Sequence, residues 1–67
     1  MVRLLFVDDD VHAHRVLRMA LQGGHTVQSA YTGAQGIAMA RAEDPDVVLL
    51  DLRLPDRDGL EVLREIL

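Results

Sequence analysis

The sequence predicts an α/β fold in which alternating strands and helices build a parallel sheet. Two short segments, residues 2–7 and 47–50, are almost free of polar residues, as expected for strands buried on both faces. A stretch with helix-forming features follows each predicted strand. The resulting order βαβαβα requires parallel strands joined by right-handed crossovers.

The first predicted strand, residues 2–7, reads VRLLFV and runs directly into the aspartates Asp8 to Asp10. A helix is expected at residues 11–21, and the aspartates stand where carboxylates stabilise its positive end. Gly23 and Gly24 then provide a stop signal. The apolar residues of this helix have helical spacing: Ala13, Val16, Leu17, Ala20 and Leu21.

Residues 25–30 form a weaker second predicted strand. Thr32 and Gln35 then resemble a capping box, and the helix that they begin must end before Pro45. The third strand, 47–50, closes on Asp51, and the loop 53–57 leads to a third helix that begins at Asp58. Its apolar stripe contains Leu60, Leu63, Ile66 and Leu67. This last helix has no stop signal, so we expect the chain to be a truncated fragment.

Composition excludes several classes of protein. The chain has 67 residues, a net charge of −4, 49% apolar residues and no cysteine. This favours one small ordered domain over a disordered chain, and it disfavours a nucleic-acid binder, which would show a basic face. No apolar run is as long as a transmembrane helix, and no signal peptide is recognisable. We therefore expect a soluble, cytoplasmic protein with no nucleic-acid or membrane partner.

Three carboxylates form the candidate site. Asp8 and Asp9 follow the first strand, and Asp51 follows the third. In an open parallel sheet, ligands bind beyond the carboxyl ends of the strands, where the strand order switches. Carboxylates that meet there repel one another unless a cation is bound, and an all-oxygen set suits Mg²⁺ or Mn²⁺. Helix capping is the simpler explanation for Asp10 and Asp58.

Two motifs resemble the receiver domain of response regulators, a CheY-like family with a flavodoxin-like fold. Residues 6–10, FVDDD, are similar to its opening, and residues 48–59 are similar to its phosphoacceptor segment. In that segment Pro55 and Gly59 stand four and eight residues after Asp51. The resemblance covers residues 1–67 and implies the first three βα units of the domain, with strand order 2-1-3.

The resemblance also implies a chemistry. Asp51 would be the catalytic phosphoacceptor, taking a phosphoryl group from a histidine kinase. Asp8 and Asp9 would hold Mg²⁺ (or Mn²⁺), Asp9 directly and Asp8 at least through water, and the backbone carbonyl of Arg53 would be a further ligand. The protein would then be a phosphoprotein of a two-component phosphorelay, a signal-transduction module and not an enzyme.

The chain also departs from the family. It contains no lysine, and its seven basic residues are all arginine. The family's phosphate-binding lysine and switch hydroxyl belong to its second half, so the isolated half is expected to be impaired. Residues 47–50 would form an exposed apolar edge. We expect this edge to pair with its copy in a two-fold homodimer of strand order 2-1-3-3′-1′-2′.

Two other functions compete with the first. The chain could be a dissected or designed flavodoxin-like half that forms a homodimer without signalling. An aspartate-dependent phosphotransferase or phosphatase would need a second aspartate two residues after Asp51, where Arg53 stands instead. His12, His14 and His25 are expected to be surface residues and not a metal cluster, because His12 and His14 do not face each other on a helix.

Overall fold

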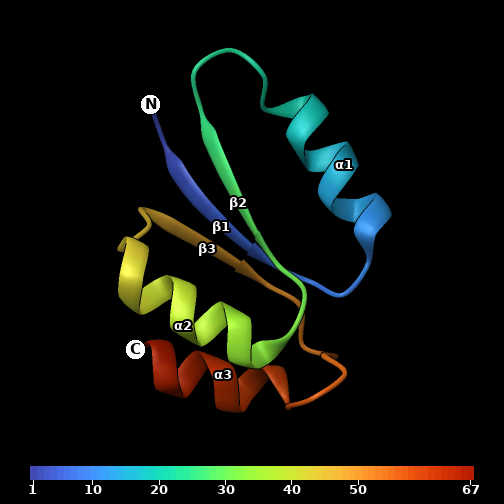
Figure 1. Ribbon diagram of the computed structural model, residues 1–67, viewed down its shortest axis with the longest axis vertical. Helices are drawn as coiled ribbons and strands as arrows, with labels where there is room; N and C mark the ends of the chain where they lie inside the picture. Colours follow the sequence, from blue (N-terminus) through green and yellow to red (C-terminus); the bar gives the residue numbers. More distant parts are fainter.

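A sheet of three parallel strands lies at the centre of the protein (Figure 1). The computed structural model describes all residues from 1 to 67. β1 (Arg3–Val7) is the middle strand, with β2 (Thr26–Ala30) on one side and β3 (Val47–Leu50) on the other. The predicted fold class and the strand order 2-1-3 are confirmed.

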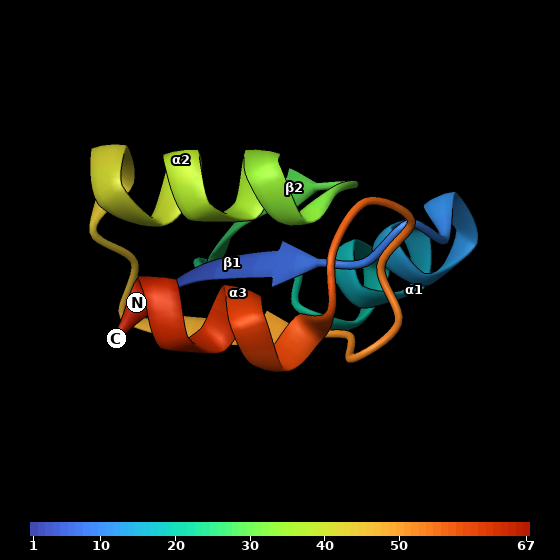
Figure 2. The same cartoon turned by 90° about the horizontal axis from the view of Figure 1, so that it is seen from below.

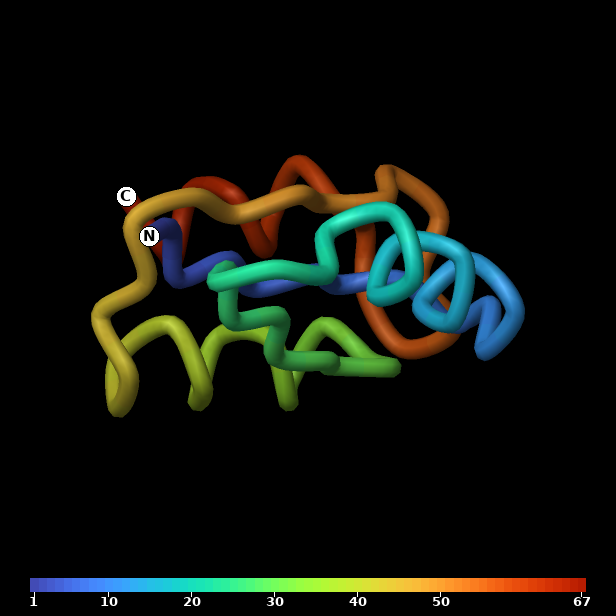
Figure 3. The backbone as a smooth tube through the Cα atoms, turned by 90° about the horizontal axis from the view of Figure 1, so that it is seen from above, coloured from blue at the N-terminus to red at the C-terminus, as the bar shows by residue number.

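The helices cover the two faces of the sheet unequally. α1 (Val11–Ala20) lies on one face, and α2 (Gly33–Glu43) and α3 (Gly59–Ile66) share the other (Figures 1 and 2). The backbone tube in Figure 3 follows the two crossovers, from β1 to β2 through α1 and from β2 to β3 through α2. The bounds of each element agree with the prediction to within one or two residues, as is usual for helix and strand ends.

The core lies between the sheet and α2. Leu5 and Val7 of β1 are fully buried together with Ala30 of β2. Gly36 of α2 permits the close approach, because a Cβ atom there would lie 2.9 Å from both methyl carbons of Val7. The partly buried residues packed against this core are Met39, Ala40, Val48, Leu50 and Leu54.

Each helix begins at a side-chain cap. The caps accept hydrogen bonds from backbone N–H groups: Asp10 from His12 (2.9 Å), Thr32 from Gln35 (3.1 Å) and Asp58 from Leu60 (3.0 Å). Such caps satisfy donors that the helix itself leaves unpaired. The capping predictions for these positions are confirmed.

The capping box of α2 differs in one detail from its usual form. The Gln35 side chain reaches back as predicted, but it accepts a hydrogen bond from the backbone N–H of Tyr31, at 2.8 Å, and not from that of Thr32. The bond extends the cap by one residue and fixes the end of β2 against the start of α2.

Several apolar side chains are more exposed than their helical spacing suggests. Val16 on α1 and Leu60 and Leu63 on α3 are exposed, and Val62 is the fully buried apolar residue of α3. Val16 lines an apolar groove beside Phe6 and Leu17 that no further element covers. Leu60 and Leu63 are likewise not covered by another element. The predicted stripe of α3 therefore lies largely on the surface.

One prediction about the histidines is wrong. His12 and His25 are exposed as expected, but His14 is only 2% exposed and is the one buried residue of α1. Both ring nitrogens of His14 have hydrogen-bond partners. Burial of a polar ring costs little when its nitrogens are satisfied, so a surface position was not required.

No helix of the protein has the length and apolar character needed to cross a membrane.

Candidate acidic site

Asp8 and Asp51 each extend one of two neighbouring strands by one residue. Val7 is paired with Leu50 in the ladder between β1 and β3, and the backbone N–H of Asp51 donates to the carbonyl of Val7 at 2.9 Å. The two aspartates therefore leave the sheet side by side at the same edge. Asp9 is one residue further along and more exposed than either.

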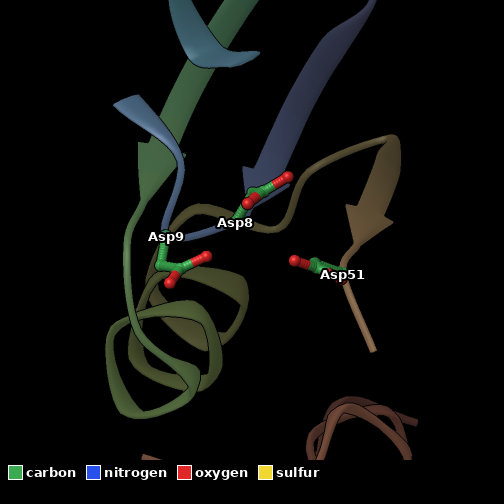
Figure 4. A group of neighbouring side chains, drawn as sticks. All are labelled: Asp8, Asp9 and Asp51. Carbon is green, nitrogen blue, oxygen red and sulfur yellow. The ribbon is translucent and has the colours of Figure 1, made fainter. Parts of the chain in front are cut away.

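The three carboxylates converge, as Figure 4 shows. One oxygen from each of Asp8, Asp9 and Asp51 can be chosen so that all lie within 4.8 Å of one another. The predicted convergence of the three carboxylates is therefore confirmed. Three oxygen donors of this charge match what Mg²⁺ or Mn²⁺ takes as ligands, so the residues present fit such an ion. The mutual repulsion of the carboxylates favours binding of a cation.

Local hydrogen bonds hold two of the carboxylates in place. Asp8 Oδ1 accepts from the backbone N–H of Asp10 at 3.0 Å, and Asp51 Oδ1 accepts from the backbone N–H of Arg53 at 3.1 Å. The second oxygen of each carboxylate has no hydrogen bond to the protein. Each aspartate therefore keeps one oxygen available for a ligand. The side chain of Arg53 is exposed, and the predicted role of its carbonyl stays a prediction.

The loop behind Asp51 is tightly closed. The backbone N–H of Gly59 donates to the carbonyl of Leu52 at 3.1 Å. A Cβ atom at Gly59 would lie 2.5 Å from Leu52 Cα and 2.6 Å from the carbonyl oxygen of Asp51. These neighbours are backbone atoms, which cannot move aside as a flexible side chain can. Glycine at this position therefore sets the path of the chain directly after the phosphoacceptor candidate.

The same loop is attached to α2 at its far end. The carboxylate of Asp56 accepts from the backbone N–H groups of Gly33 (2.7 Å) and Ala34 (3.0 Å). The hydrogen bond from Gly33, followed by that from Ala34, holds the pKa of Asp56 below its ordinary value of 3.8. Beside it, Arg57 forms an ion pair of 2.8 Å with Glu65, and this hydrogen bond raises the pKa of Arg57.

His14 belongs to this site although the sequence did not indicate it. Its Nε2 lies 2.7 Å from the backbone carbonyl oxygen of Asp8, and its Nδ1 lies 2.8 Å from Ser29 Oγ. The ring is flanked by Phe6 and Tyr31, each with a centroid separation of 4.5 Å. The one available signal was its place between Ala13 and Leu17, on the face of α1 that turns toward the sheet.

The family follows from fold, site and sequence together. The family model described as the response regulator receiver domain matches residues 4–67. The chain belongs to the response regulator receiver domain family, and its sheet and helices match half of that family's flavodoxin-like fold. Receiver domains are signalling modules of two-component systems.

Curated relatives and solved structures agree. The chain is 39% identical over 67 residues to Protein PilH of Pseudomonas aeruginosa, covering 98% of this chain and 55% of PilH. It is 42% identical over 67 residues to the KDP operon transcriptional regulatory protein KdpE of Escherichia coli, covering 98% of this chain and 30% of KdpE. A CheY-like receiver domain structure from Methanospirillum hungatei superposes with a TM-score of 0.92 at 33% identity, covering 98% of this chain and 54% of that one. The chain thus spans about half or less of each of these proteins.

Proposed function

We propose that this chain is a phosphoacceptor module of two-component signalling in which Asp51 receives a phosphoryl group. The observation that carries the proposal is the convergence of Asp51 with Asp8 and Asp9 at the carboxyl edge of a receiver sheet. The phosphodonor would be a phosphohistidine of a sensor kinase. The chain itself would be the acceptor of that reaction, not a separate enzyme.

The transfer follows from the position of Asp51. Its free carboxylate oxygen forms a bond to phosphorus while the bond between phosphorus and the donor histidine nitrogen breaks. That nitrogen keeps the bonding electron pair, and Asp51 becomes an aspartyl phosphate. The hydrogen bond from the Arg53 N–H holds one oxygen of Asp51, so the second oxygen is the one left free to attack.

Asp8 and Asp9 would hold Mg²⁺ or Mn²⁺, with the backbone carbonyl of Arg53 as a further ligand. When bound, the cation neutralises negative charge on the phosphoryl oxygens. Without it, three carboxylates would face an incoming phosphate, and their repulsion would oppose the approach. The site therefore predicts that phosphorylation depends on a divalent cation.

Phosphorylation by a small donor tests this function. The chain is incubated with acetyl phosphate and MgCl₂, and intact-protein mass spectrometry measures the phosphorylated fraction. We expect one labelled aspartate, Asp51, with no labelling in Asp51→Asn or in the presence of EDTA. Asp58→Asn is the matched control, because asparagine caps a helix as well as aspartate does. Absence of label in the wild-type chain under all conditions would refute the proposal.

The lifetime of the phosphoryl group is a separate part of the proposal. The 67 residues contain no lysine that could pair with the phosphate. We therefore expect the phosphorylated chain to lose its label faster than a receiver of full length carried through the same assay. Equal lifetimes would show that residues 1–67 hold the phosphate by themselves.

We also propose homodimerisation through β3 for the 67-residue chain. β3 is an edge strand, and its Val47 and Leu49 are 41% and 40% exposed. An apolar strand edge with free backbone N–H and C=O groups can pair with a second copy. A two-fold axis would make that pairing antiparallel. Light scattering at several protein concentrations tests this, and a monomer at all concentrations would refute it.

A further inference from the structure

The buried His14 links α1 to the acidic site through an ordered set of hydrogen bonds. The carbonyl of Asp8 can only accept, so the nitrogen that faces it, Nε2, carries the proton. In the neutral ring the other nitrogen, Nδ1, then accepts from the hydroxyl of Ser29. Ser29 Oγ in turn accepts from the guanidinium of Arg18 at 2.7 Å. Every donor in the chain Arg18, Ser29, His14, Asp8 points the same way, which strengthens each bond.

The bond from His14 fixes a peptide group that the site depends on. The carbonyl of Asp8 and the N–H of Asp9 belong to one planar unit, so the orientation of this carbonyl sets the orientation of the peptide between them. The N–H of Asp8 is held separately by the carbonyl of Ala30, at 3.0 Å. Because the N–H and the C=O of Asp8 are both held by hydrogen bonds, the backbone that carries Asp8 and Asp9 has little freedom to rotate.

The location of His14 makes it suited to this task. It is the only buried residue of α1, and its ring is held between Phe6 of β1 and Tyr31 at the end of β2. No side-chain nitrogen or oxygen buried in the protein lacks a partner. The ring is thus immobilised by two aromatic contacts and by bonds at both nitrogens, as a residue that orients another must be.

We propose that His14 is a positioning residue of the acidic site: its Nε2–H orients the Asp8–Asp9 peptide so that both carboxylates meet Asp51. The inference rests on the proposed cation site, which its first test, a titration with magnesium, requires. Its second test uses the metal-free chain and does not require that site. His14 does not touch the phosphoryl group or the cation. It acts through the backbone of the residues that do.

Two substitutions separate the effect of the Nε2–H hydrogen bond to Asp8 from the effect of ring packing against Phe6 and Tyr31. His14→Phe keeps an aromatic ring between Phe6 and Tyr31 but removes the donor. His14→Gln places an amide N–H near the position of Nε2 and removes the ring. Val62→Ala lowers stability from the opposite face of the sheet without contact with α1, and it controls for destabilisation alone.

Magnesium binding is measured from the amide chemical shifts of Asp8, Asp9 and Asp51 during titration with MgCl₂. We expect His14→Phe to weaken binding by about tenfold, the lower end of what loss of a ligand-orienting partner costs. We expect His14→Gln to recover much of that loss and Val62→Ala to leave the affinity unchanged. Equal affinities of His14→Phe and the wild-type chain would overturn the inference.

If the wild-type chain shows no response to magnesium, the proposed cation site is refuted. The positioning role of His14 is then decided by a measurement on the metal-free chain. Imidazole nitrogen shifts of the metal-free chain are expected to show the tautomer protonated at Nε2. The amide of Asp9 is expected to shift more in His14→Phe than in Val62→Ala. A ring without a proton on Nε2, or an Asp9 amide unchanged by loss of the histidine, would overturn the positioning role whatever the fate of the metal site.

Discussion

The carboxylate of Asp56, in the loop after β3, accepts a hydrogen bond of 2.7 Å from the backbone N–H of Gly33, 23 residues earlier in the chain. Gly33 is the first residue of α2, where the helix leaves its N–H groups unpaired and where its dipole favours negative charge. The bond joins the loop that follows Asp51 to a helix on the same face of the sheet. The hydrogen bond therefore stabilises the loop behind Asp51 although neither of its partners belongs to the acidic site.

The contact between Asp56 and α2 predicts a pH dependence of stability. Since the Gly33 and Ala34 N–H groups hold the pKa of Asp56 below 3.8 in the folded state, the unfolded state binds the proton more readily. The stabilisation is present above the unfolded pKa and is lost as the pH falls through the folded pKa. We expect Asp56→Asn to be less stable than the wild-type chain at neutral pH and the difference to shrink below about pH 4.

Urea denaturation across this pH range measures the difference. Asp44→Asn removes a carboxylate whose side chain accepts no hydrogen bond, and it serves as the control for lost charge. A difference in the free energy of unfolding between Asp56→Asn and the wild-type chain that stays constant down to acidic pH would contradict the prediction.

Gly59→Ala is predicted to damage the site as well as the fold. The new methyl group would press on backbone atoms of Asp51 and Leu52, so the loop must shift. Overpacking of this kind costs about 2 kcal/mol or more of unfolding free energy. Phosphorylation by acetyl phosphate should slow at the same time. Thermal unfolding and the labelling assay measure the two effects.

Gly36→Ala is the matched control for that substitution. Its Cβ would lie 2.9 Å from both methyl carbons of the buried Val7, which costs packing energy, but its three nearest neighbours include no backbone atom. Alanine also favours a helix interior by about 1 kcal/mol over glycine, which offsets part of that cost. We expect Gly36→Ala to be the milder change. Gly59→Ala with unaltered stability and labelling would show that the backbone path after Asp51 is less constrained than the structure indicates.

Asp9→Asn is predicted to have opposite effects with and without magnesium. Asp9 is exposed, and its carboxylate makes no hydrogen bond to the protein, so the substitution removes repulsion without removing a bond. We expect the metal-free variant to gain about 0.5 kcal/mol. In saturating MgCl₂ the wild-type chain should become the more stable of the two, because a ligand that binds the folded state stabilises it.

Thermal unfolding with EDTA and with MgCl₂ measures this reversal. Glu61→Gln, on α3, removes one charge away from the acidic site and should respond equally to both conditions. The prediction fails if Asp9→Asn and the wild-type chain keep the same order of stability in both.

Leu49→Lys is predicted to separate the proposed dimer. Lysine on an edge strand places a charge where the second copy would pair, and it should raise the dimer dissociation constant by about tenfold or more. The variant should remain folded, because Leu49 is already 40% exposed. Leu60→Lys, on the exposed side of α3, is the control. Sedimentation of both variants should show loss of dimer in the first alone, and loss in neither would contradict pairing through β3.

The strands and the acidic site could be predicted because they depend on neighbours along the chain. An apolar run that ends in aspartate marks both the strand and the place where it leaves the sheet, which applies to Asp8 and to Asp51. Parallel pairing then brings the two together without further information. The three helix caps were predictable for the same reason, since each cap and its N–H partner lie two or three residues apart.

His14 and Asp56 could not be predicted in this way. The burial of His14 depends on Ser29 and Tyr31, which lie in and directly after β2. The apolar spacing of α1 gives no information about these contacts. The partners of Asp56, Gly33 and Ala34, are likewise far from it in the sequence, at the start of α2. His14 is polar and would be expected at the surface until the tertiary contacts that satisfy it are known, whereas Asp56 is exposed and only its partners were unpredictable.

The middle position of β1 also has a consequence for biosynthesis. Leu4 pairs with Val27 on one side and with Val47 on the other, so during synthesis β1 must wait for two strands that follow it in the chain. During that interval its apolar residues are available to chaperones or to other nascent chains. β1 and β3 cannot pair before residue 50 has emerged, so the carboxylates of Asp8 and Asp51 meet only after β3 has been synthesised.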